Sequence, residues 1–161
     1  MATDADVSEE IAQLERYLDR AVEEVFGTMI GVGCSRTSSP HPTDGIMIAA
    51  LIGLAGAMSG TLVLQCDSAA AMRVSELMTG LAPTEVDPTV RDAMGEMANM
   101  IAGAWKGYDP QLSSACLLST PTIVVGRRYE LFSRRSVIRI DRVYAFESFL
   151  CAISLACERA A

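Results

Sequence analysis

Glu96 and Asn99 are two polar side chains in a stretch that otherwise consists mainly of small and apolar residues. At about 100° per residue, helical spacing places them on one face, close to the line of Asp92. Neither group is a nucleophile or a strong base, but an asparagine amide can donate a hydrogen bond to a water molecule and also accept one from it. The pair could therefore support chemistry that depends on positioning, not on covalent attack.

Gly95 and Gly103 lie close to this pair on the helical projection. A glycine inside a helix costs about 1 kcal/mol relative to alanine. Two glycines beside two polar side chains therefore imply that another molecule approaches this face closely. A solvated helix face would show the same spacing of Glu96 and Asn99, so the pair alone does not identify a site.

The chain has 161 residues, half of them hydrophobic, which is typical of one folded domain that we expect to span residues 1–161. Lys and Arg total 13 against 20 Asp and Glu, and the resulting net charge of −7 argues against nucleic acid as a partner. His41 is the only histidine, so the chain has few side chains that could act as the general base of a hydrolase.

The five cysteines are widely spaced and form no C-x-x-C pair; they are Cys34, Cys66, Cys116, Cys151 and Cys157. We expect no metal site, because a zinc site would need clustered thiols with histidine partners. The cysteines are instead interpreted as small apolar residues of a reduced core. The N-terminal residues lack a basic region followed by an apolar core, so we expect no secretory signal and a cytoplasmic location.

The stretch from Gly45 to Cys66 contains no charged residue and is long enough to span a bilayer. Several glycines interrupt its middle, and no Lys or Arg flanks either end. We therefore favour two buried strands joined near Gly56–Gly60 over a transmembrane helix, and we expect no membrane insertion.

Apolar spacing, N-cap residues and closing glycines predict three helices. They are Glu9–Met29 after Ser8 as the cap, Ala69–Met78 after an Asp67-Ser68 cap, and a helix from Pro88 to about Lys106 after Asp87 as the cap. Residues 35–44 are polar and proline-rich, which predicts a loop. Further strands are expected at Ala115–Leu118, Thr122–Val125, Tyr129–Phe132, Val137–Ile140 and Phe146–Leu155. Long helices with runs of antiparallel strands favour an α+β domain.

The string from Asp92 to Gly103 (DAMGEMANMIAG) resembles a motif of the CheC/CheX family of chemotaxis phosphatases, most nearly of its CheX branch. Leu51–Gly80 is similar to the family's glycine-punctuated hairpin and the helix that follows it. Thr120–Gly126 (TPTIVVG) is similar to one of the family's strands. The resemblance covers most of the chain and implies a CheC-like fold, in which a duplicated helix-plus-antiparallel-strands unit packs two long helices on a mainly antiparallel sheet.

A short internal repeat agrees with such a duplication, because residues 24–31 can be aligned with residues 96–103. Glu24 then matches Glu96, but Gly27 stands where the second copy has Asn99. The resemblance therefore implies that the first copy is silent and that the chain has one site, as in the CheX type.

The family resemblance implies hydrolysis of the phosphoaspartate on a CheY-like receiver domain. By this resemblance Asn99 would orient the attacking water and Glu96 would pair with a lysine of the receiver. Asp92 matches a position where serine is also seen and, like Gly95 and Gly103, would face the partner. The chain would need no cofactor of its own, because the receiver would supply Mg²⁺. The resemblance also implies a homodimer built by sheet pairing.

Two other functions remain open: a non-catalytic module of the same fold that binds receivers or other signalling partners, and a small-molecule binder that uses Gly45–Cys66. Several arginines of the C-terminal third either protect exposed strand positions from edge pairing or attract an acidic receiver surface. They are Arg127, Arg128, Arg134, Arg135, Arg139 and Arg142.

Overall fold

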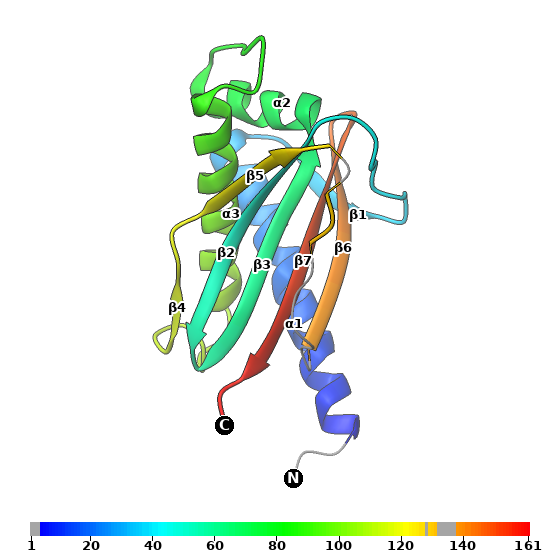
Figure 1. Ribbon diagram of the computed structural model, residues 1–161. Coiled ribbons are helices and arrows are strands. Elements are labelled where there is room, and N and C mark those ends of the chain that lie inside the picture. The colour runs from blue at the N-terminus through cyan, green and yellow to red at the C-terminus, as the bar shows by residue number, and fades with distance from the viewer. Residues whose placement is uncertain (1–3, 128, 132–137) are drawn as a thin grey trace.

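The computed structural model describes residues 4–127, 129–131 and 138–161, and these contain three α-helices, one π-helical turn and one seven-stranded sheet (Figure 1). The helical elements are α1 (Asp4–Val25), η1 (Phe26–Ile30), α2 (Ser68–Thr79) and α3 (Pro88–Gly107). The strands are β1 (Cys34–Thr37), β2 (Met47–Gly56), β3 (Met58–Asp67), β4 (Cys116–Leu118), β5 (Thr122–Gly126), β6 (Ile138–Phe146) and β7 (Phe149–Arg159). Every described strand pair is antiparallel, and the predicted α+β class is confirmed.

The strand order is β1-β6-β7-β3-β2-β4, with β5 also paired to β2. Alternate residues of the central strands point toward the helices and are buried; on β2 these are Ile48, Ala50, Ile52 and Leu54. Figure 1 shows α1 running behind the sheet and α3 standing beside its β2 and β5 edge. The helices thus cover one face of the sheet, and the core lies between the two layers.

The two predicted caps of α2 and α3 are confirmed. Asp67 is the N-cap of α2, and its Oδ1 accepts a hydrogen bond from the backbone N–H of Ala70 at 2.8 Å. Gly80 ends that helix in the left-handed conformation, with a φ of 76°. Asp87 caps α3 in the same way as Asp67 caps α2, and Pro88 occupies the first turn.

The predicted start of the first helix is wrong, because α1 already includes Asp4. Ser8 lies inside the helix, where its hydroxyl donates to the carbonyl of Asp4 at 2.8 Å and caps nothing. The predicted end at Met29 is also wrong, because α1 ends at Val25, and Met29 is 52% exposed. The π-helical turn η1 changes the number of residues per turn there, so the 3.6-residue period no longer applies.

Two predictions about strands also need correction. Residues 35–44 are not all loop, because the short strand β1 occupies Cys34–Thr37 and pairs with β6. Phe146–Leu155 is not one strand: a turn at Glu147, whose φ is 49°, joins β6 to β7. Of the expected strand at Tyr129–Phe132, residues 129–131 are not in a strand, and Phe132 and Val137 lie outside the described residues.

The uncharged stretch Gly45–Cys66 forms the β2–β3 hairpin, as predicted. None of the described helices is long and apolar enough to cross a membrane. All five cysteines are buried and none is in a disulfide, in agreement with their interpretation as core residues.

Candidate functional site

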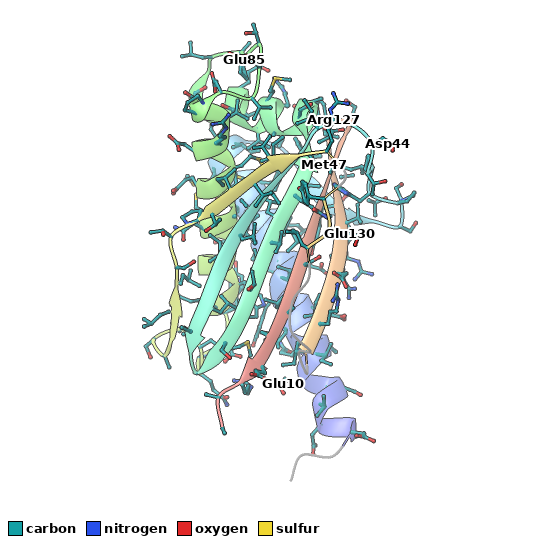
Figure 2. The ribbon with its side chains drawn as sticks, in the orientation of Figure 1. Glu10, Asp44, Met47, Glu85, Arg127 and Glu130 are labelled. Carbon is teal, nitrogen blue, oxygen red and sulfur yellow. The ribbon has the colours of Figure 1, made fainter. Side chains whose placement is uncertain are left out.

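Helix α3 is anchored at both ends, which makes it a rigid support for side chains on its outer face. The Asp87 carboxylate accepts from Val90 N at 2.9 Å at its start. Near its end the Trp105 indole Nε1 donates to the Leu14 carbonyl of α1 at 3.3 Å, and Lys106 Nζ donates to the Ser113 carbonyl at 2.7 Å. The Figure 2 view places Glu85 on the α2–α3 connection, at the end of the molecule where α3 begins.

The inner face of α3 is purely a packing surface. Its residues Val90, Met94, Met97, Ile101 and Trp105 are at most 1% exposed. Cys66 of β3 lies beneath the helix, with its Sγ 3.9 Å from Sδ of Met94, and burial raises the pKa of the thiol. This thiol therefore stays protonated and contributes packing rather than chemistry.

The outer face carries the predicted pair. Glu96 is exposed and Asn99 is half-buried, one helical turn apart, and Asp92 is exposed one turn before Glu96. No described residue forms a hydrogen bond or an ion pair with any of these three side chains. A Cβ atom at Gly103 would meet no neighbouring atom within 4 Å, so this part of the face is open. The structure thus brings Asp92, Glu96, Asn99 and Gly103 together on one accessible ridge.

Gly95 does not belong to this ridge, and its expected exposure is wrong. The residue is buried, and a methyl group there would lie 3.1 Å from Cβ of Pro121. Ala102, which lies on the same side of the helix, is 0% exposed. Gly95 therefore permits contact with a segment of this chain, and not with a partner.

The segment against Gly95 is the connection between β4 and β5, which the reasoning from sequence did not place beside the site. Ser119 fixes it to β2, because its backbone N–H donates to the Gly53 carbonyl at 2.9 Å and its Oγ accepts from Gly53 N at 2.8 Å. Pro121 follows two residues later and is exposed. Thr120–Gly126 is similar to a strand of the family, but no spacing rule links this segment to Gly95.

The first copy of the internal repeat, residues 24–31, has a different geometry. Glu24 lies on α1, whereas Gly27 lies in the π-helical turn η1. Both are exposed, but the wider turn changes their relative direction, and Gly27 has no side chain. The pair of functional groups on α3 is therefore not repeated on α1.

The chain matches known proteins over most of its length. The family model described as "Chemotaxis phosphatase CheX" matches residues 48–141, more than half of the chain, and these include α3 and both β4 and β5. The chain belongs to the CheX family. The CheY-P phosphatase CheX of Thermotoga maritima is 26% identical over 144 residues, which cover 86% of this chain and 92% of that protein. The predicted family membership is confirmed.

Solved structures agree on the CheX fold. The crystal structure of CheX from Vibrio vulnificus matches with a TM-score of 0.78 at 21% identity, covering 92% of this chain and 98% of that one. A CheX–CheY–BeF₃–Mg²⁺ complex from Borrelia burgdorferi matches with a TM-score of 0.71 at 16% identity, covering 91% and 97%. These similarities confirm the predicted CheC-like fold.

The remaining candidates lie away from α3. A cavity of about 280 Å³ is lined by Leu51, Thr61 and Val63, among others, which belong to the region considered for small-molecule binding. These residues point away from the helices, so the cavity lies on the opposite face of the sheet. Within the described residues, no cluster of three or more His, Cys, Asp or Glu side chains could hold a metal ion.

Proposed function

We propose that this CheX-family chain hydrolyses the phosphoaspartate of a CheY-like receiver domain. The observation that carries the proposal is the exposed ridge of α3, on which Glu96 and Asn99 project one turn apart without partners in the described chain. A rigid helix with unengaged polar groups can enter the active site of another protein without first breaking internal contacts. The relative from Thermotoga maritima is named a CheY-P phosphatase, and the Borrelia burgdorferi structure is a complex with CheY.

In this mechanism Asn99 holds the attacking water in line with the phosphorus–oxygen bond. Its amide oxygen accepts from the water and its NH₂ group donates to it or to a phosphoryl oxygen. The water adds to phosphorus, the acyl phosphate bond breaks, and the products are the free aspartate carboxylate and inorganic phosphate. Phosphoryl transfer depends mainly on positioning and charge stabilisation, so the chain needs neither a nucleophile nor a strong base.

Glu96 supplies the docking contact, in which its carboxylate pairs with the lysine of the receiver and fixes α3 over the phosphoryl group. Asp92 and Gly103 border the same ridge, and the bare backbone at Gly103 allows close approach. The Mg²⁺ belongs to the receiver, in agreement with the Borrelia burgdorferi complex, which contains Mg²⁺ and BeF₃ together with CheY. As part of this proposal we expect a homodimer in the cytoplasm.

The direct test is to mix the purified chain with phosphorylated CheY-like receivers and to follow phosphate release over time. We expect release well above the rate of the receiver alone. A chain that binds phosphorylated receivers but leaves that rate unchanged would instead be the non-catalytic binding module. The BeF₃-activated receiver is the probe for binding, because it cannot be turned over.

A further inference from the structure

Most of the arginines that the structure describes are neutralised by carboxylates of the chain itself. Five of the described arginines form ion pairs with Asp or Glu; they are Arg36, Arg73, Arg139, Arg142 and Arg159. Arg139 and Arg142 are two of the arginines expected either to protect exposed strand positions or to attract an acidic receiver, and they pair with Asp141 and Glu15. Cations that lack such a partner are therefore the ones available to another molecule.

Two available cations lie near the C-terminal end of α3, Lys106 on the helix itself and Arg20 on the neighbouring helix α1. Lys106 lies in the last turn, seven residues after Asn99 and in nearly the same direction, which places it about 10 Å along the helix. Its Nζ uses one of three donors on the Ser113 carbonyl. Arg20 of α1 reaches the same end of the helix, with its Cζ 4.3 Å from the ring centroid of Tyr108, which follows α3 two residues after Lys106.

The side chain of Arg20 is held in place without being neutralised. It stacks on Tyr108, whose ring in turn lies 6.0 Å from that of Tyr17. No described carboxylate lies within ion-pair distance of Arg20, and no hydrogen bond to a described residue uses its donors. An arginine that is stacked on an aromatic ring keeps its charge and its fork of donors and has less rotamer freedom to lose on binding.

The ridge of α3 therefore has opposite charge at its two ends. Asp92 and Glu96 stand toward the start, Asn99 and Gly103 are neutral, and Lys106 makes the last turn positive, with Arg20 of α1 as a second cation near that end. Such an arrangement fits a protein partner that presents a cation at one end of the interface and carboxylates at the other. Two cations on a chain of net charge −7 do not suffice for nucleic acid.

We propose that Arg20 and Lys106 form a second docking contact, which binds acidic side chains of the receiver outside its phosphorylation site. This inference rests on the proposed function and extends it: Glu96 and Asn99 act at the phosphoryl group, whereas Arg20 and Lys106 set the orientation and the rate of docking. Arg16 lies one turn before Arg20 and bonds to Gln13, so it adds positive charge at the edge of this contact.

The experiment compares Arg20→Glu and Lys106→Glu with Arg127→Glu. Arg127 is an exposed arginine at the end of β5, near Met47 in Figure 2, and no described carboxylate pairs with it. Each variant is assayed for dephosphorylation of a receiver that the wild-type chain turns over, and for binding of the same receiver loaded with BeF₃ and Mg²⁺. Both assays are run at low and at high salt, and circular dichroism checks that each variant is folded.

We expect Arg20→Glu and Lys106→Glu to raise both KM and the dissociation constant about 3- to 10-fold at low salt, with kcat within about twofold of wild type. High salt should shrink the difference, and Arg127→Glu should behave as wild type. The milder variant Arg20→Gln should give a smaller change of the same kind, and it replaces Arg20→Glu in both assays if the charge reversal fails to fold.

Unchanged KM and binding in the Arg20 variants, or an equal loss in Arg127→Glu, would overturn the second contact. A wild-type chain that dephosphorylates no receiver would instead refute the proposed function.

Discussion

Gly95 on α3 and Pro121 on the β4–β5 connection are in direct contact. A methyl group at Gly95 would lie 3.1 Å from Cβ of Pro121 and 3.4 Å from Cδ1 of Ile123, distances that leave no room for a larger side chain. Gly103 lies two turns later on the same helix, and a methyl group there would meet nothing within 4 Å. One glycine therefore serves packing within the chain, and the other leaves an open surface.

We expect Gly95→Leu and Gly103→Leu to have opposite effects on the melting temperature. Leucine is a better helix former than glycine by up to about 1 kcal/mol, so Gly103→Leu should raise the melting temperature. Gly95→Leu should lower it, because the side chain must displace Pro121 from α3. Gly103→Leu should nevertheless weaken binding of the BeF₃-loaded receiver, because its side chain fills the space that the partner needs. A Gly103→Leu variant that melts earlier and binds normally would show that this glycine packs inward.

Local signals account for the parts of the fold that could be predicted. The Asp67 and Asp87 caps and the closing Gly80 fix α2 and the start of α3 through hydrogen bonds within a few residues. The ridge with Glu96 and Asn99 follows from the same helical period, because α3 is regular to its end. The roles proposed for these side chains rest on the family resemblance, because spacing alone cannot assign them.

The failures arise where contacts distant in sequence decide the structure. The short polar strand β1 exists because it pairs with β6, more than 100 residues later. The turn at Glu147 has a positive φ without the glycine or asparagine that usually indicates one. Gly95 is only about 40° from Asn99 on the helix, and the boundary between exposed and buried is set there by Pro121.

Asn99→Ala should abolish accelerated dephosphorylation and leave receiver binding largely intact. The loss of the amide that is proposed to position the water should lower the rate about 100-fold or more. Rates are measured by phosphate release from a phosphorylated receiver, and binding is measured with the BeF₃-loaded form. Gln111→Ala removes another amide, from an exposed residue just after α3, and should have no effect on either quantity. An Asn99→Ala variant with the wild-type rate would exclude this role for Asn99.

Glu96→Ala should reduce binding and rate together, because it removes the charge pair proposed with the receiver lysine. The dissociation constant and kcat/KM are therefore expected to change in parallel, unlike those of Asn99→Ala. Glu158→Ala, which removes an exposed carboxylate on β7, is the matched control and should leave both unchanged. A Glu96→Ala variant with normal binding and a reduced rate would move Glu96 from docking to chemistry.

The ion pair between Arg73 of α2 and Glu147 of the β6–β7 turn should make stability depend on pH. The Arg73 guanidinium binds both carboxylate oxygens, at 2.8 and 2.9 Å, and this hydrogen bonding lowers the pKa of Glu147 below its ordinary value of 4.5. A folded-state pKa below the unfolded one stabilises the fold above pH 4.5, and this stabilisation is lost as the pH falls through the folded-state value.

Arg73→Leu should therefore lower the melting temperature at neutral pH, and its difference from wild type should shrink in acid once Glu147 and Glu76, the second carboxylate bound to Arg73, are protonated. Thermal melts across the acid range measure this difference. Arg139→Leu removes the more exposed pair with Asp141 and should change stability less. If the effect of Arg73→Leu were the same at all pH values, the pair with Glu147 would not be its cause.

Homodimer formation is expected through β5, because this strand leaves an unprotected edge of the sheet. Its only described strand partner is β2, and its sequence Thr122–Gly126 contains no charged residue. The unpaired part of β6, Ile138–Arg142, also lies at an edge of the sheet but carries Arg139, Asp141 and Arg142, which oppose edge pairing. Val125 of β5 is 41% exposed and would be covered by a second copy.

Antiparallel pairing of β5 with its copy would extend one sheet across a two-fold axis, and α3 of each chain would remain free for one receiver. Light scattering at micromolar concentration should give the mass of two chains. Val125→Glu places like charges together at the axis and should give the mass of one chain, whereas Leu81→Glu, at a residue 74% exposed after α2, should stay dimeric. A wild-type mass near that of a single chain would exclude the dimer, and a dimer that survives Val125→Glu would place the contact on another edge.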